Sequence, residues 1–315
     1  MRPQTTGTLA AGSCGVRTLA FILPLMLLPA VGRAEPPLAP GAPIAPFTPV
    51  PRDVARSSMW RESWPTFSWP EGVATVSAGA LTLALALHQQ PAQPRWSGGI
   101  LFDDAVRNSL RLHSPADRLS VRHVGDWTYY TAPVLPLIVD PLLAALAARG
   151  DGKAALNLEL VGLEAFSYAG LLSLTSTRIA VRERPDVTEC RREHPDGIGC
   201  GSDTESFWSG HTAIVAASAG LVCASHRYMP LWGSPVADGG ACALAATSAL
   251  VTGFSRMTAD RHYATDVIIG TGVGFGFGYA VPVLLHYSRK KNDIVVAVQP
   301  DALGSGALVN VAGVF

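Results

Sequence analysis

Charge is scarce in this chain. Only 15% of its residues are charged, and 24 basic side chains balance 24 acidic ones, so the formal net charge is zero. A neutral chain lacks the basic surface that binds nucleic acid and the acidic tail of a charged interaction segment. Hydrophobic residues make up 48% of the sequence. This balance favours contact with a membrane or a well-buried helical bundle.

Cysteine is also rare, and its pattern does not indicate a metal centre. The five cysteines do not have the spacing with histidine that metal ligands show. Cys190 and Cys200 flank a polar loop, which a disulfide between them would stiffen. Cys223 and Cys242 either pair or remain buried free thiols.

The first 34 residues have the pattern of a secretory signal peptide. Arg2 and Arg17 precede an apolar run from Leu19 to Leu28, and small residues favour cleavage after Ala34. An uncleaved membrane anchor is the alternative. Either segment would place the rest of the chain in an oxidising extracytoplasmic compartment, the periplasm. There we expect it to be membrane-associated or an integral membrane protein.

The remaining chain divides into three parts. Residues 35–70 contain so much proline that we predict an extended linker. Residues 71–288 form the predicted domain, an all-α six-helix bundle, and the amphipathic stretch 101–124 adds one or two surface helices. In the tail, residues 289–315, the segments 294–298 and 307–311 flank a turn segment from Pro300 to Gly306 and predict a short β-hairpin. The six apolar segments of the bundle are 73–88, 131–148, 155–178, 211–226, 240–257 and 263–287.

Near the C-terminus, a histidine with a nearby carboxylate follows a Ser-Arg pair. His262 lies six residues after Arg256 and four before Asp266. Residues four apart share a helix face, so we expect Asp266 to hold one ring nitrogen of His262 and leave the other free to attack. With Arg256 binding an anion, these groups are suited to accept a phosphoryl group on histidine.

Two upstream blocks extend this pattern. One runs from Ser206 to His211, and the other contains Arg184-Pro185. In this order the three blocks resemble the signature of the type 2 phosphatidic acid phosphatase and vanadium haloperoxidase superfamily: Lys-x6-Arg-Pro, Pro-Ser-Gly-His and Ser-Arg-x5-His-x3-Asp. Trp208 replaces a proline, and Thr177 stands where the lysine belongs. The resemblance covers roughly residues 75–288 and implies a helical bundle of that superfamily's kind.

The resemblance implies three catalytic residues. His262 is the expected nucleophile, and Asp266 is expected to fix its tautomer and stabilise the cation that forms. His211 is the expected general acid, which protonates the departing alkoxide and later activates water. In an up-down bundle, the helix ends that carry all three motifs lie on one side, so we expect these residues to converge.

Further residues are expected to bind the phosphate. Arg184 and Arg256 would bind its oxygens bidentately, Ser209 would add a hydroxyl donor, and Gly210 would let the backbone approach closely.

Thr177 cannot supply the positive charge of the missing lysine. We expect Arg182 to replace that charge in part, and Arg178 is the alternative.

These expectations predict a metal-independent phosphatase that hydrolyses a phosphate monoester through a phosphohistidine intermediate. The substrate is a lipid phosphate or diphosphate at a membrane surface. No cofactor is expected, although vanadate, a phosphate mimic, would act as an inhibitor or, in a haloperoxidase, as the cofactor. The alternatives, in order, are a periplasmic acid phosphatase acting on small phosphate esters, a vanadium haloperoxidase, and a non-catalytic protein that binds phosphate or lipid head groups.

Overall fold

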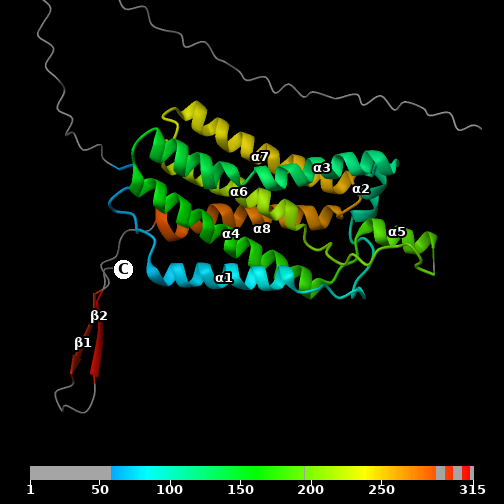
Figure 1. Cartoon of the computed structure of the whole chain (residues 1–315), viewed down its shortest axis with the longest axis horizontal. Helices are drawn as coiled ribbons and strands as arrows, with labels where there is room; N and C mark the ends of the chain where they lie inside the picture. The colour runs from blue at the N-terminus through cyan, green and yellow to red at the C-terminus, as the bar shows by residue number, and fades with distance from the viewer. Residues whose placement is uncertain (1–57, 195, 289–294, 301–306, 313–315) are drawn as a thin grey trace, which may run out of the picture. The chain divides into compact units, whose positions relative to one another are not determined.

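The computed structural model describes residues 58–194, 196–288, 295–300 and 307–312 (Figure 1). The predicted signal peptide and most of the predicted linker lie outside these residues. The helical elements are α1 (Trp69–Leu87), α2 (Asp103–Leu110), α3 (Pro115–Thr131), η1 (Leu135–Ala147), α4 (Gly152–Ala180), α5 (Pro185–Glu193), α6 (Gly210–Tyr228), α7 (Pro235–Thr258), α8 (Ala264–Pro282) and η2 (Val283–Tyr287). In the tail, β1 (Val295–Pro300) pairs antiparallel with β2 (Ala307–Ala312), with Val295 opposite Ala312.

The prediction of a helical domain is confirmed, but six helices are too few. Within the described ranges there are eight α-helices and two π-helical segments. One additional element is α5, which lies outside the six predicted segments and begins with Pro185 at its first position, where the missing N–H has no helical partner anyway. The predicted apolar segment 131–148 forms the π-helical segment η1, which follows α3 with a bend of 42° between them.

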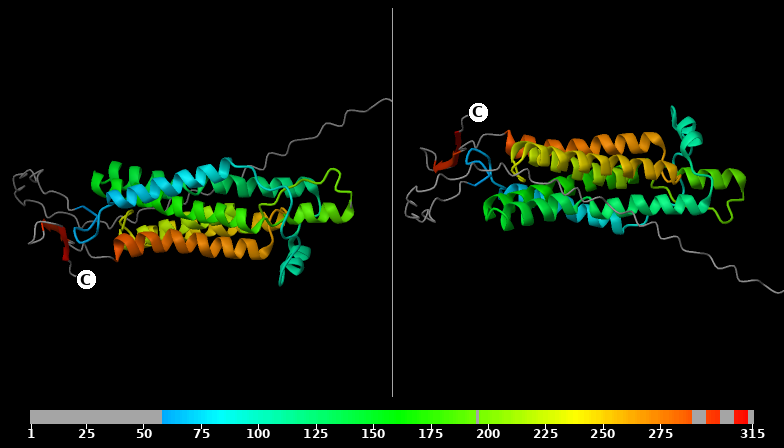
Figure 2. Two further views of the ribbon diagram at one scale, coloured as in Figure 1. Left: turned by 90° about the horizontal axis from the view of Figure 1, so that it is seen from below. Right: turned by 90° about the horizontal axis from the view of Figure 1, so that it is seen from above.

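Helix α6 lies at the centre of the bundle and packs against α4, α7 and α8. Figure 2 shows these helices running lengthwise beside one another. Their contacts enclose a core rich in alanine and valine, with Val215, Ala216 and Val222 fully buried on α6.

The contact between α6 and α8 depends on glycine. A Cβ atom at Gly274 would overlap the carbonyl oxygen of Ala213, and one at Gly278 would overlap that of Ala217. Only a residue without a side chain permits two helix backbones to approach so closely. This approach brings the beginning of α6 against the beginning of α8, where the amide of Ser209 donates a hydrogen bond to the carbonyl of Asp266 at 3.2 Å.

The end of the predicted linker packs on the bundle. Trp60 and Trp64 are buried in a cluster that includes Met229 and Tyr287, whereas Trp69, the first residue of α1, is 81% exposed. The linker prediction to residue 70 therefore reaches too far, because residues 58–68 are anchored by these two tryptophans.

Several helices have the length and composition of membrane spans. These are α1, α4, α7 and the combined segment Ala264–Tyr287, and the bent pair of α3 and η1 adds a fifth if it is counted as one span. Large apolar side chains are exposed along α1 and α7, among them Val76, Leu83, Leu244 and Leu250. Extended exposed apolar surfaces of this kind mark contact with a membrane. The chain is therefore membrane-associated.

Candidate active site

The three sequence motifs meet at one end of the bundle, as expected. Helix α4 finishes at this end, where α2 and α5 also lie (Figure 1). Val181 ends α4 in a left-handed conformation, with φ of 46°, and so turns the chain toward Arg184 at the start of α5. His211 lies in the first turn of α6, and His262 lies in the turn between α7 and α8. Side chains from all three motifs line one cavity of about 410 Å³.

The cavity has a polar end and an apolar wall. Arg184, His211 and His262 form the polar part, together with the backbone of Gly210. Phe166 and Leu174 of α4 and Ile214 of α6 contribute the apolar wall, and Thr82 and Ala86 extend it to α1.

His262 has the state that a nucleophile requires. It is buried, and its Nδ1 lies 2.8 Å from the main-chain carbonyl oxygen of Ser206. Because a carbonyl oxygen only accepts, Nδ1 carries the proton and Nε2 keeps its lone pair. Burial and the positive charges of Arg184 and Arg256 hold the pKa of His262 well below its usual value. The ring is therefore neutral at pH 7.

The predicted contact between Asp266 and His262 is wrong. Asp266 instead binds Nη1 of Arg182 at 2.5 Å, the hydroxyl of Ser206 at 2.7 Å and the amide of Tyr263 at 3.0 Å. The error has a simple cause: α8 begins at Ala264, so His262 precedes the helix and the four-residue helical spacing does not apply. Asp266 reaches the nucleophile only through Ser206.

The predicted role of Arg182 as a phosphate ligand is also wrong. Its side chain is fully buried and pairs with Asp103 at 2.8 Å as well as with Asp266. The guanidinium lies between the rings of Trp96 and Tyr263, at 4.1 and 4.0 Å from their centroids. Arg182 thus neutralises two buried carboxylates and lies among aromatic rings, away from the cavity.

Arg178 does not replace the missing lysine either. Its guanidinium donates to the main-chain carbonyls of Leu85 and His88. Thr177 lines the cavity, and its hydroxyl donates to the carbonyl of Leu174. The position of the family's lysine is therefore uncharged here.

Arg184 and Arg256 each have a buried guanidinium nitrogen that no described residue contacts by a hydrogen bond. Arg184 forms an ion pair with Asp203 through Nε at 2.8 Å, and its buried Nη1 has no hydrogen-bond partner within the described ranges. Nε of Arg256 is likewise buried without a partner there. Burial and the charge of nearby Arg261 lower the pKa of Arg184. Buried cations with unused donors favour a bound anion.

Ser209 and Gly210 have different roles at the beginning of α6. Ser209 is the N-cap, and its buried hydroxyl accepts from the amide of Thr212 and shares a hydrogen bond with the Thr212 hydroxyl. It does not line the cavity. Gly210 and His211 do line it. Because a helix N-terminus attracts anions, this position is compatible with the predicted role of Gly210.

Asp126 of α3 is a site residue that sequence reasoning missed. Its Oδ1 lies 2.7 Å from Nη1 of Arg256 and 3.1 Å from Nε2 of His211. Asp126 lies outside the three motifs, so no motif spacing indicates it. In the sequence it is one carboxylate beside Gly125, between the amphipathic stretch 101–124 and the apolar segment 131–148. The tilted ring of Tyr129 stacks near His211, with centroids 4.5 Å apart.

The described residues contain two disulfides, of which Cys190–Cys200 lies on the segment between the first two motifs. Cys190 and Cys200 join the end of α5 to the loop that leads to Ser206, and Cys223 and Cys242 join α6 to α7. Within the part of the chain that the structure describes, no group of three or more histidine, cysteine or carboxylate side chains is arranged to hold a metal ion. Metal independence remains a prediction.

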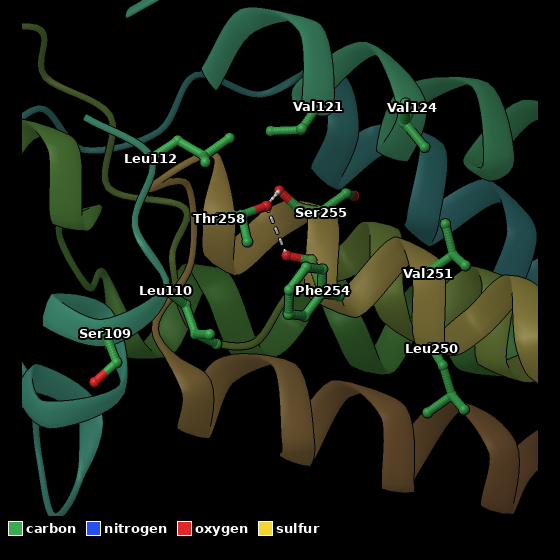
Figure 3. Close-up of a pocket in the computed structure, with 10 residues that line it drawn as sticks. All are labelled: Ser109, Leu110, Leu112, Val121, Val124, Leu250, Val251, Phe254, Ser255 and Thr258. Carbon is green, nitrogen blue, oxygen red and sulfur yellow. Dashed lines mark hydrogen bonds between the residues drawn. The ribbon is translucent and has the colours of Figure 1, made fainter. Parts of the chain in front are cut away.

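A second cavity, of about 560 Å³, lies between α2, α3 and α7, and its lining does not include Arg184, His211 or His262 (Figure 3). The hydroxyls of Ser255 and Thr258 donate hydrogen bonds to carbonyl groups of α7. The surface of this second cavity is therefore mainly apolar. The other lining residues are Ser109, Leu110, Leu112, Val121, Val124, Leu250, Val251 and Phe254.

Comparison with known proteins confirms the resemblance. Residues 161–290, which contain all three motifs, match the family model of the PAP2 superfamily. No curated protein matches the chain. Among solved structures, the chain is similar to a transmembrane PAP2 type phosphatidylglycerolphosphate phosphatase from Bacillus subtilis, at 21% identity. That alignment covers 67% of this chain and 94% of the other, with a TM-score of 0.42.

Proposed function

We propose that this chain, with the PAP2 match across its catalytic segment, is a phosphatase that hydrolyses a lipid phosphate monoester through a phosphohistidine on His262. One observation carries the proposal. A single cavity contains His262, neutral with Nε2 free, beside His211 and Arg184 and next to an apolar wall. A nucleophile, an acid–base group and an anion-binding cation are the three parts that phosphoryl transfer to histidine requires.

In the first step, Nε2 of His262 attacks phosphorus and the bond from phosphorus to the ester oxygen breaks. His211 passes a proton to that oxygen, which leaves as an alcohol. Arg184, Arg256 and the amides at the beginning of α6 stabilise the equatorial oxygens of the transferring group. In the second step, His211 accepts a proton from water as that water attacks the phosphohistidine, and inorganic phosphate is released.

The apolar wall favours a lipid over a small soluble ester. Phe166, Leu174 and Ile214 continue from the phosphate end toward α1, which is among the candidate spans and is the most exposed of them. An alkyl chain attached to the phosphate would lie along this wall and reach the bilayer. We place the reaction on the extracytoplasmic side of the membrane, because two disulfides suit an oxidising compartment.

The test compares wild type with His262→Ala, with the exposed His194→Ala as the matched control. Phosphate release is measured from phosphatidate in mixed micelles and from p-nitrophenyl phosphate, and the phosphoenzyme is trapped by rapid quenching. We expect His262→Ala to lose both activities and the acid-labile, alkali-stable phosphoenzyme, whereas His194→Ala keeps them. We also expect chelators to have no effect and vanadate to inhibit competitively.

Three results would contradict the proposal. Wild-type rates in His262→Ala would exclude this nucleophile. Binding of phosphatidate without phosphate release by the wild type would favour a head-group binding protein. Peroxide-dependent halide oxidation with added vanadate would favour a haloperoxidase.

A further inference from the structure

One carboxylate contacts both a phosphate-binding cation and the general acid. Oδ1 of Asp126 lies between Nη1 of Arg256 and Nε2 of His211, at 2.7 and 3.1 Å. Its Oδ2 lies 3.8 Å from Nε of Arg122. Because a substrate phosphate is expected to meet the same arginine and the same histidine, Asp126 presents a negative oxygen where a substrate oxygen would bind.

The packing of α3 against α7 fixes this carboxylate in place. A Cβ atom at Gly125 would overlap the hydroxyl of Ser255, so the two helices touch beside Asp126. One turn further along, the hydroxyls of Thr128 and Thr252 form a buried hydrogen bond of 2.7 Å. Two close contacts on the same side of α3 leave little freedom for its backbone. Asp126 is thus directed at the site by buried structure.

We propose that Asp126 is a positioning residue of this phosphatase, which keeps His211 able to hold a proton and neutralises Arg256 until a phosphate arrives. The proposal rests on the proposed function, since it gives His211 the role of general acid.

The charges around His211 explain why such a residue is needed. Arg256 faces it from α7, Arg184 from the start of α5, and His262 from the turn before α8. Burial and the two arginines lower the pKa of His211 to about 3, and the charge of Asp126 acts in the opposite direction. Glu205 also lines the cavity but pairs only distantly with Arg184, at 3.8 Å. Asp126 is therefore the carboxylate that directly contacts His211.

The role predicts opposite effects on catalysis and on anion binding. Asp126→Asn removes the charge that favours protonated His211, so fewer enzyme–substrate complexes contain the acid. An alkyl phosphate needs that acid because its alkoxide is a poor leaving group, whereas p-nitrophenolate leaves without much help. Removing the charge also frees Arg256 for inorganic phosphate, which should bind at least as tightly as before.

The experiment measures kcat for phosphatidate and for p-nitrophenyl phosphate, the inhibition constant of inorganic phosphate, and the pH profile of kcat. The variants are Asp126→Asn and Asp126→Glu, with Asp117→Asn as an exposed control on the same helix. In Asp126→Asn, we expect kcat to fall about 100-fold for phosphatidate and less than tenfold for p-nitrophenyl phosphate. The alkaline limb of the pH profile of kcat should move to lower pH in Asp126→Asn. In Asp126→Glu, which keeps the negative charge, this limb should stay at the wild-type pH.

Equal losses on both substrates, together with weaker phosphate binding, would overturn the proposal and show that Asp126 only holds Arg256 in position. If Asp126→Asn does not fold, a shift of the alkaline limb in Asp126→Glu would overturn it. Failure of the proposed function is a separate result, because it requires an inactive wild type or an active His262→Ala.

Discussion

His262 is held by the main-chain carbonyl of Ser206, 2.8 Å from Nδ1, and Asp266 reaches it only through that serine. A carbonyl fixes the tautomer as a carboxylate would, but it adds no negative charge beside the ring. The nucleophile is therefore kept neutral by burial and by neighbouring arginines. After the phosphoryl group is transferred, the negative charge that balances the ring comes from the phosphate itself.

Ser206→Ala tests this indirect link. The change removes the hydroxyl that donates to Asp266 at 2.7 Å but keeps the carbonyl that accepts from His262. A hydrogen bond to a charged group contributes about 1.5–3 kcal/mol, so we expect kcat with p-nitrophenyl phosphate to fall about tenfold or more. Ser120→Ala, an exposed position on α3, is the control. Unchanged kcat in Ser206→Ala, with Asp266→Asn inactive, would instead indicate a direct contact between Asp266 and His262.

Replacement of Arg182 is expected to reduce stability, whereas replacement of Arg184 is expected to reduce activity. Arg182→Ala would leave the carboxylates of Asp103 and Asp266 buried without their partner, and loss of one member of a buried pair costs about 3–5 kcal/mol. We expect a clear fall in the midpoint of thermal unfolding in detergent. Arg184→Ala should keep that midpoint near the wild-type value while kcat/KM falls about 100-fold or more. If Arg182→Ala unfolded at the wild-type midpoint but bound phosphate more weakly, Arg182 would be a phosphate ligand after all.

The sequence was sufficient to predict where the motifs meet but not which side chains touch. Their convergence follows from helix order alone, because consecutive antiparallel helices return to the same end of a bundle. The partner of His262 depends on the residue at which α8 begins, and an error of two residues moves His262 from helix to turn. The burial of Arg182 depends on Asp103 and Trp96, which lie far upstream and belong to no motif.

The close contact between α6 and α8 has a signal in the sequence. Gly270, Gly274 and Gly278 recur every four residues, and residues with this spacing share one helix face. Small residues at that spacing permit close helix packing within membranes. By contrast, Asp126 had no comparable signal, because its partners His211 and Arg256 come from different helices.

The pH profile should show an acidic optimum. In the free site His262 is neutral because its pKa is lowered well below the usual value, so the nucleophile stays active as the pH falls below 6.5. His211, with a pKa of about 3, is also neutral near pH 7. The proton that His211 passes to the leaving group therefore enters the site on the substrate, whose phosphate has a second pKa of about 6, and His211 takes it up only in the enzyme–substrate complex.

We therefore expect kcat/KM to fall about tenfold per pH unit above roughly pH 6, and its acid limb to lie well below pH 6.5. The measurement is kcat/KM from pH 4 to 9 in a buffer of constant ionic strength. A phosphate ester with a lower second pKa should move the alkaline limb by the same amount. An optimum near pH 8 would show that His211 is already protonated in the free enzyme and that the substrate does not bring the proton into the site.

Gly274→Ala and Gly276→Ala should have opposite effects, although they are two residues apart on α8. A methyl group at Gly274 would overlap the carbonyl oxygen of Ala213, whereas nothing lies within 4 Å of a methyl group at Gly276. Overpacking costs about 1–3 kcal/mol, and replacement of an exposed helical glycine by alanine contributes up to about 1 kcal/mol of stability. Gly274→Ala should therefore lower the midpoint of thermal unfolding, and Gly276→Ala should keep or raise it. Activity should follow, because separating α6 from α8 moves His211 away from His262. Equal midpoints and equal kcat in the two variants would mean that the two helices can move apart freely, and that the site does not depend on their contact.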